Sequence, residues 1–185
     1  MRRIESSLTN MVLVLLVICG LSAAALGATY GLTQPRLIAL EQARRLEAIR
    51  SVLPAFDNDP LAAAIVTELG TLFPAESGGS SVGAAVQVAV GGYGGDVVVM
   101  VGFDADARVN AVSVLSHSET PGLGARITEP QFLQQFADAH PAQNAVAVAK
   151  DGGAIDALTA ATISSRAVAT AVNTAAGVHR AESAR

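Results

Sequence analysis

The longest uninterrupted apolar stretch of the chain lies near its amino terminus. No charged side chain occurs between Ser6 and Pro35, and the most apolar part runs from Met11 to Tyr30. A helix of about 20 apolar residues, rising ~1.5 Å per residue, spans the hydrocarbon layer of a bilayer. The pattern therefore predicts a transmembrane helix over residues 11–33.

A cleaved signal peptide is the competing interpretation, with Arg2 and Arg3 as its basic start and Ala23–Ala25 as its cleavage site. The apolar stretch exceeds the usual ~7–15 residues of a signal peptide, which favours an uncleaved anchor. The first arginines predict a short cytoplasmic N-terminus over residues 1–10 and a domain outside the membrane. Other arginines favour the opposite orientation, but a long domain is translocated largely regardless of its charge. They are Arg36, Arg44, Arg45 and Arg50.

Helical patterning continues after the apolar stretch. Periodic apolar positions predict a helix from Thr33 to Pro54, with Pro35 in its first turn, where the missing N–H costs nothing. A short helix is predicted from Leu61 to Leu69, and the Gly/Ser run from Ser77 to Ser81 is predicted to be flexible. We therefore expect residues 34–82 to form a helical stalk and linker.

The pattern then becomes typical of strands, which are predicted over residues 84–90, 96–103 and 108–115. The near-continuous valines of the second strand indicate that both of its faces are covered. The glycine cluster Gly91–Gly95 is interpreted as a hairpin turn, because it lacks the spacing of a phosphate-binding loop and no clear helix follows it. Together these segments predict an antiparallel meander.

Helical periodicity returns in the last third. A helix is predicted over residues 129–139, a further strand over 145–149, and a final helix that follows residues 156–165 and ends near Gly177. The expected fold class is α+β: a mostly antiparallel sheet of four or more strands flanked by helices, on one N-terminal transmembrane helix.

Composition excludes several function classes. The 12 basic and 16 acidic residues give a net charge of −4, with no basic surplus for nucleic acid. Cys19 is the single cysteine, so neither an internal disulfide nor a thiolate metal cluster is expected. His117, His140 and His179 lack the spacing of a helical metal site. We predict no catalytic residue and no metal ligand.

Two segments carry candidate binding chemistry. In Glu119–Gly124, proline and glycines let the backbone approach a ligand closely, beside a carboxylate and a hydroxyl that can hold a polar heterocycle. Thr159–Ser165 leads into the final helix, whose amino-terminal N–H groups and dipole favour a phosphate. Ordinary helix capping by Ser or Thr is the alternative for the second segment.

In combination, these segments resemble the FMN-binding domain of the G subunit of the Rnf electron transport complex. The same domain type occurs in the C subunit of the sodium-pumping NADH:quinone reductase. The family's flavinylation motif, Asp-x-x-Ser/Thr-Gly-Ala-Thr, corresponds to Asp156–Thr162, with Ala160 in place of glycine. The signature His-x-Glu-Thr-Pro-Gly-Leu-Gly corresponds to His117–Gly124. Gly92-Tyr93 and Lys150–Gly153 also resemble the family.

The resemblance covers roughly Ala84 to Val178 and implies an FMN-binding domain over residues 83–180, followed by a tail over residues 181–185. In this family a flavin transferase attaches FMN through a phosphoester to the last threonine of the motif, here Thr162. The flavin is expected between the Thr120–Gly124 loop and the start of the last helix. The implied cofactor-binding residues are Thr162, Thr159, Ala161, Asp156, Glu119, Thr120, Leu123 and Gly124.

The implied function is a membrane-anchored electron relay within an Rnf-type ion-translocating oxidoreductase complex. Its partners would be membrane and iron–sulfur subunits, with a flavin transferase during maturation. The implied location is the bacterial inner membrane, single-pass, with the soluble domain on the periplasmic side. The alternatives are the C subunit of the quinone reductase, a membrane-tethered non-redox scaffold in which Thr162 is only a cap, and a free-standing flavin reductase. A free-standing flavin reductase would need a second catalytic site, and the sequence shows none. It also shows no motif for binding a nicotinamide cofactor.

Overall fold

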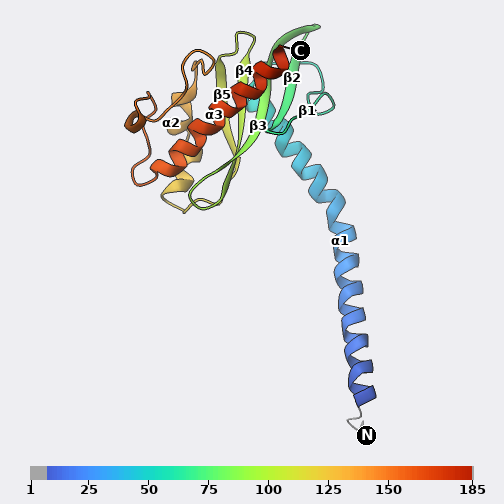
Figure 1. The fold of residues 1–185 in the computed structure, drawn as a ribbon. Helices are drawn as coiled ribbons and strands as arrows, with labels where there is room; N and C mark the ends of the chain where they lie inside the picture. Colours follow the sequence, from blue (N-terminus) through green and yellow to red (C-terminus); the bar gives the residue numbers. More distant parts are fainter. Residues whose placement is uncertain (1–7, 185) are drawn as a thin grey trace. The chain divides into compact units, whose positions relative to one another are not determined.

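A computed structural model describes residues 8–184 of the chain (Figure 1). These residues divide into two compact units, the first ending at Arg44 and the second beginning at Arg45. Most of the predicted cytoplasmic segment, residues 1–7, lies outside the described residues, as does the last residue of the predicted tail.

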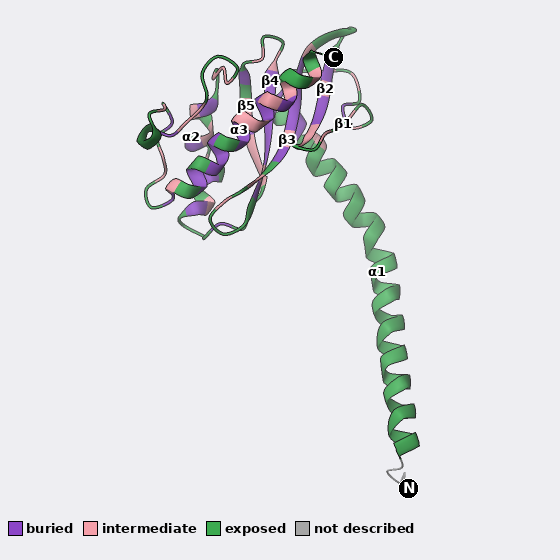
Figure 2. Ribbon diagram, viewed as in Figure 1, coloured by how far each residue is buried: buried purple, intermediate pink, exposed green. Residues whose placement is uncertain are grey.

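The first unit consists of most of helix α1 (Leu8–Val52), which is continuous over 45 residues. An 18-residue window of α1 has a mean hydropathy of 2.6 and is not buried, so the helix is long and apolar enough to cross a membrane (Figure 2). The predicted helix start at Thr33 is wrong, because α1 runs through Pro35. This proline lacks the N–H that would pair with the carbonyl of Gly31, and the helix tolerates that loss.

The second unit contains a five-stranded antiparallel sheet in the order β1-β2-β3-β4-β5. The predicted meander is confirmed, since every neighbouring pair of strands is antiparallel. The strands are β1 (Ile65–Val66), β2 (Thr71–Ser77), β3 (Ser80–Gly91), β4 (Asp96–Asp104) and β5 (Val109–Ser116).

The first two strands lie within the segment expected to be stalk and linker. The predicted helix over residues 61–69 is wrong, because β1 occupies part of it. The β-branched run Ile65-Val66-Thr67 favours a strand over a helix. The run from Ser77 to Ser81 contains a hairpin turn, in which Gly78 and Gly79 adopt φ angles of +59° and +77°. Two successive residues with positive φ are typical of a tight hairpin turn.

Helix α3 (Thr162–Ser183) covers one face of the sheet, and the end of α1 packs against the other (Figure 1). On the first face, Val168 and Val172 of α3 belong to the same buried cluster as Phe103. On the second face, Ile49 and Val52 form a cluster with residues of β2, β3 and β4. Strand β4 contributes buried side chains to both clusters, as its valine-rich sequence predicts.

The connection between β5 and α3 is long, from residue 117 to residue 161, and contains several short helical turns. These turns are η1 (Gly124–Thr128), α2 (Pro130–Leu133), η2 (Gln134–Phe136) and η3 (Ala149–Asp151). The helix predicted over residues 129–139 is therefore shorter and divided, although Phe132 and Phe136 are buried and meet edge to edge, 5.4 Å between ring centroids.

Two predictions near the carboxyl terminus are wrong. The strand predicted over residues 145–149 is reduced to a single bridge between Val148 and Ile155. Helix α3 continues past Gly177 to Ser183. An internal glycine costs a helix only about 1 kcal/mol, and the packing of the buried Val178 favours continuation.

Candidate functional site

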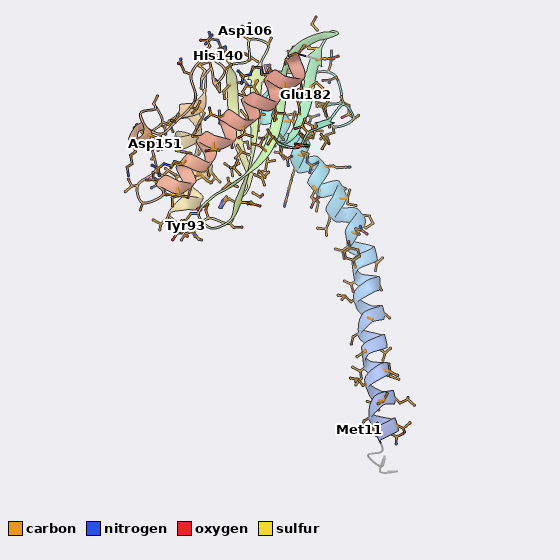
Figure 3. The ribbon with its side chains drawn as sticks, in the orientation of Figure 1. Met11, Tyr93, Asp106, His140, Asp151 and Glu182 are labelled. Carbon is orange, nitrogen blue, oxygen red and sulfur yellow. The ribbon has the colours of Figure 1, made fainter. Side chains whose placement is uncertain are left out.

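A cavity of about 400 Å³ lies at the end of the second unit where α3 begins. Its walls come from the β3–β4 turn, the loop after β5 and the segment that leads into α3. Figure 3 shows Tyr93 at this end of the unit, near the start of α3. The lining residues are Tyr93, Glu119, Thr120, Leu123, Gly124, Ala160, Ala161, Thr162, Ile163 and Ser164.

Glu119 joins the three walls of the cavity. Its side chain is only 5 % exposed. Oε1 accepts hydrogen bonds from the backbone N–H groups of Tyr93 (2.6 Å) and Gly94 (3.2 Å). Oε2 accepts a hydrogen bond of 2.6 Å from the hydroxyl of Ser164, in the first turn of α3. A single carboxylate therefore fixes the hairpin turn, its own loop and the helix start relative to one another.

The hydrogen bonds also keep Glu119 ionised. Burial alone raises the pKa of this carboxyl, but the hydrogen bonds from Ser164, Tyr93 and Gly94 together lower it below its ordinary value. Nδ1 of His117 accepts a hydrogen bond of 3.2 Å from the backbone N–H of Glu119. His117 thus supports the loop rather than lining the cavity.

Glycines allow the three walls to approach Glu119 closely. A Cβ at Gly92 would lie 2.2 Å from Oε1 of Glu119. A Cβ at Gly124 would lie 2.4 Å from Oε2 of Glu119 and 2.7 Å from the hydroxyl of Ser164. Contacts this short are repulsive, so neither position accepts a side chain without displacing the carboxylate.

The start of α3 differs from an ordinary capped helix. Thr162 is its first residue, and the preceding Ala161 provides no side-chain cap. The hydroxyl of Ser165 does not cap the helix either, because it accepts a hydrogen bond from the N–H of Leu158 and donates one to the carbonyl of Ala161, both 3.0 Å. Thr162 lines the cavity instead. Its hydroxyl is thus placed beside uncapped N–H groups, which favour an anion.

Ala160 explains why the family motif carries a glycine at this point. Its φ angle is +61°, in the left-handed region. Glycine adopts this conformation without a steric penalty, whereas a residue with a Cβ pays roughly 1–2 kcal/mol. The turn before Thr162 therefore forms with alanine, at some cost in stability.

The structure brings together six of the eight cofactor-binding residues predicted from the sequence. Asp156 and Thr159 do not line the cavity, and neither is buried. The backbone N–H of Asp156 donates a hydrogen bond of 2.7 Å to the side chain of Gln135. The six that line the cavity are Glu119, Thr120, Leu123, Gly124, Ala161 and Thr162.

Sequence reasoning missed four lining residues: Tyr93, Ala160, Ile163 and Ser164. Two of them carried a signal. Tyr93 follows Gly92 in the turn that resembles the family, and Ser164 belongs to the hydroxyl-rich run before the last helix. No cluster of three His, Cys, Asp or Glu side chains that could hold a metal ion occurs among residues 8–184.

Comparison with protein families first shows which class of domain the second unit contains. The family model described as the FMN-binding domain matches residues 92–177, which include the β3–β4 turn, the Glu119 loop and most of α3. A solved structure, the C subunit of the Na(+)-translocating NADH-quinone reductase of Parabacteroides distasonis, is similar over 72 % of this chain and 77 % of that chain. Its TM-score is 0.52 and its identity 21 %, which shows a shared fold.

Full-length relatives then give the family. The G subunit of the ion-translocating oxidoreductase complex of Stutzerimonas stutzeri is 38 % identical over 82 % of this chain and 72 % of its own length. The G subunit of Methanosarcina acetivorans is 35 % identical over 92 % of this chain and 94 % of its own length. The chain belongs to the family of G subunits of the ion-translocating oxidoreductase complex. With the long apolar α1, it is a membrane-anchored member of that family.

Proposed function

We propose that this chain is an electron-transfer subunit of an Rnf-type ion-translocating oxidoreductase complex and carries FMN through a phosphoester on Thr162. One observation carries the proposal: Thr162 is the first residue of α3 and lines a cavity that the loop from Glu119 to Gly124 also lines. A linked flavin therefore has a phosphate position at the helix start and a ring position against the loop.

The residues present fit this cofactor. A cavity of about 400 Å³ falls within the roughly 300–1,000 Å³ usual for small-molecule sites. Thr120, Leu123 and Gly124 would hold the ring, while the first turn of α3 would hold the phosphate. Bound FMN supplies one- and two-electron redox chemistry, and the chain supplies position and electrostatic environment.

The two predicted residues outside the cavity have a different place in the proposal. Asp156 and Thr159 lie on the approach to Thr162, and neither is buried. A side chain there is accessible to the flavin transferase that would split the pyrophosphate of FAD, join its FMN half to the hydroxyl and release AMP. We assign Asp156 to recognition by that enzyme rather than to contact with the flavin.

We place α1 in the bacterial inner membrane and the second unit on the periplasmic side. The partners would be the other membrane and iron–sulfur subunits of the complex, since the relatives are named as subunits of such an assembly. The C subunit of the quinone reductase is the second candidate. The relatives that match along most of the chain are G subunits, and this favours the Rnf-type complex.

The proposal is tested by coexpressing the full chain with a flavin transferase and recording flavin fluorescence after denaturing electrophoresis. Wild type and Thr159→Ala should give a fluorescent band, and Thr162→Ala should not. Thr162→Ser keeps a hydroxyl and should retain fluorescence. A dark wild-type band beside a fluorescent known substrate of the same transferase would contradict covalent attachment.

A second measurement separates an electron carrier from a scaffold. Oxidised flavin absorbs visible light and amino-acid side chains do not, so the flavin bands are read directly in the purified protein. Chemical reduction should bleach the flavin bands and reoxidation should restore them. A protein with no flavin bands after coexpression would support the non-redox scaffold.

A further inference from the structure

Lys150 is the only lysine in the chain, and it lies against the residue proposed to carry the flavin. Its ammonium group donates a hydrogen bond of 3.3 Å to Oγ1 of Thr162. Lys150 does not line the cavity, whereas Thr162 does. The ammonium therefore approaches the hydroxyl from outside the space that the flavin ring would occupy.

A second contact fixes the turn that carries this lysine. Asp151 follows it in η3 and receives two hydrogen bonds from the guanidinium of Arg166, 2.6 and 2.7 Å long. Arg166 lies one turn beyond Thr162 in α3. The bidentate pair holds the turn against the first part of the helix, close to Thr162. Figure 3 shows Asp151 beside the start of α3.

The same contact leaves the ammonium of Lys150 without a direct ion pair. Arg166 is engaged by Asp151, and the pKa of Asp151 is lowered mainly by the hydrogen bond from that guanidinium and in smaller part by the nearby charge of Lys150. Among residues 8–184, no carboxylate lies within ion-pairing distance of the ammonium of Lys150. A phosphodiester on Thr162 would bring one negative charge to this point.

We propose that Lys150 is the counter-cation of the phosphoester on Thr162 and positions the hydroxyl before attachment. This inference rests on the proposed function. The phosphate oxygens would be held between the ammonium and the N–H groups of the first turn of α3, which Ala161 leaves without a side-chain cap. Lys150 is thus a positioning residue, and the ring is held by other residues.

The first test compares initial rates of flavin incorporation by a flavin transferase, at low and at high ionic strength. Lys150→Met should slow incorporation on the order of fivefold at low salt, as expected for an exposed charge pair. Lys150→Arg, which keeps the charge, should recover most of the rate. The ratio of wild-type to Lys150→Met rates should shrink at high salt, because ions screen exposed charges.

Arg108→Met is the matched control, because it also removes one positive charge at the surface, at the β4–β5 turn. It should leave the rate unchanged at both salt concentrations. A Lys150→Met rate equal to that of wild type would overturn the inference. So would an equal loss in Lys150→Arg, or a loss that salt does not change, because either result indicates a structural role.

The second test uses the wild-type chain and needs no substitution at Lys150. Limited acetylation with an amine reagent, read by mass spectrometry, reports on this one side chain. Acetylation of Lys150 should be slower, on the order of fivefold, in the flavinylated protein than in Thr162→Ala expressed with the same transferase. Equal acetylation rates in the two proteins would overturn the inference about Lys150 without contradicting the proposed function. A wild-type chain that acquires no flavin would contradict both the inference and the proposed function.

Discussion

Helix α3 has a hollow at each end, and the two hollows are built from different chemistry. The hollow at its start has a volume of about 400 Å³ and contains the ionised Glu119, the hydroxyl of Ser164 and the hydroxyl of Thr162. The hollow at its other end has a volume of about 440 Å³ and is lined by five alanines, by Phe103 and His179, and by the polar side chains of Asp106, Arg180 and Ser183. That imidazole stacks on Phe103, with 5.0 Å between ring centroids.

The two ends also differ in how many contacts fix the positions of the surrounding segments. At the start of α3, hydrogen bonds and glycine contacts set the positions of three segments around one carboxylate. Near the other end, Gly177 faces open space, and the contact of His179 with Phe103 is one of packing. We infer that the hydrogen bonds at the start of α3 hold the cavity in shape for a ligand. The contacts near the other end serve the packing of the core.

The largest expected effect comes from adding one methyl group at each end of α3. Gly124→Ala should lower the free energy of unfolding by about 2–3 kcal/mol, because its Cβ would collide with Glu119 and Ser164. Gly177→Ala should raise it by about 0.5–1 kcal/mol, because alanine favours a helix. Urea unfolding measures both. Equal effects at the two positions would contradict the proposed difference.

Glu119→Gln should cost somewhat less, about 2 kcal/mol, because hydrogen bonds to a charged group contribute more than neutral ones. The pKa of Glu119 in the folded state lies below its ordinary value of 4.5. Its contribution to stability is therefore present above about pH 4.5 and is lost as the pH falls through the folded-state pKa. Melting temperatures between pH 3 and 7 should fall less steeply on acidification in Glu119→Gln. Parallel curves would contradict this role.

Ala160→Gly should stabilise the chain by about 1 kcal/mol, because glycine adopts the left-handed conformation of this turn without strain. The turn precedes Thr162, so flavin incorporation should be as fast as in wild type or faster. Thermal unfolding and incorporation rates provide the measurements. A destabilised Ala160→Gly chain would show that the methyl group makes a favourable contact in the cavity.

His179→Phe should give the smallest effect and leave flavin incorporation unchanged. Burial lowers the pKa of His179 in the folded state, opposed in part by the nearby Asp104. The unfolded chain therefore binds a proton more readily, and wild type should lose stability as the pH falls below about 6.5. Phenylalanine keeps the ring contact and removes this dependence. A shift in melting temperature between pH 7.5 and 5.5 that persists in His179→Phe would exclude this histidine as its source.

The sequence predicted those parts of the fold whose signals are local. The valine-rich β3 and β4 and the glycine turn between them follow from residue patterning. Strand β2 was not predicted, because residues 34–82 were expected to form a helical stalk and linker. It contains Pro74, a residue that interrupts the hydrogen bonding of a central strand. The structure accommodates this proline because β1 pairs only with Thr71 and Leu72, so the rest of β2 forms the edge of the sheet.

The candidate site required contacts between distant parts of the chain. Glu119 and Ser164 are 45 residues apart, and no periodicity connects them. The carboxylate accepts hydrogen bonds from the backbone N–H groups of Tyr93 and Gly94. Almost every residue has a backbone N–H, so the sequence does not reveal which of them will donate. The family motif located Thr162 and the Glu119 loop, but the contact between Lys150 and Thr162 emerged only from the structure.

The attachment point of the flavin determines where the ring and the phosphate lie in the cavity. The most direct measurement is fragmentation mass spectrometry of the tryptic peptide 151–166 from the full chain coexpressed with a flavin transferase. This peptide contains Thr159, Thr162, Ser164 and Ser165. We predict one FMN, added with loss of water, on Thr162. An unmodified peptide, or FMN located on any of the other three hydroxyls, would contradict the account.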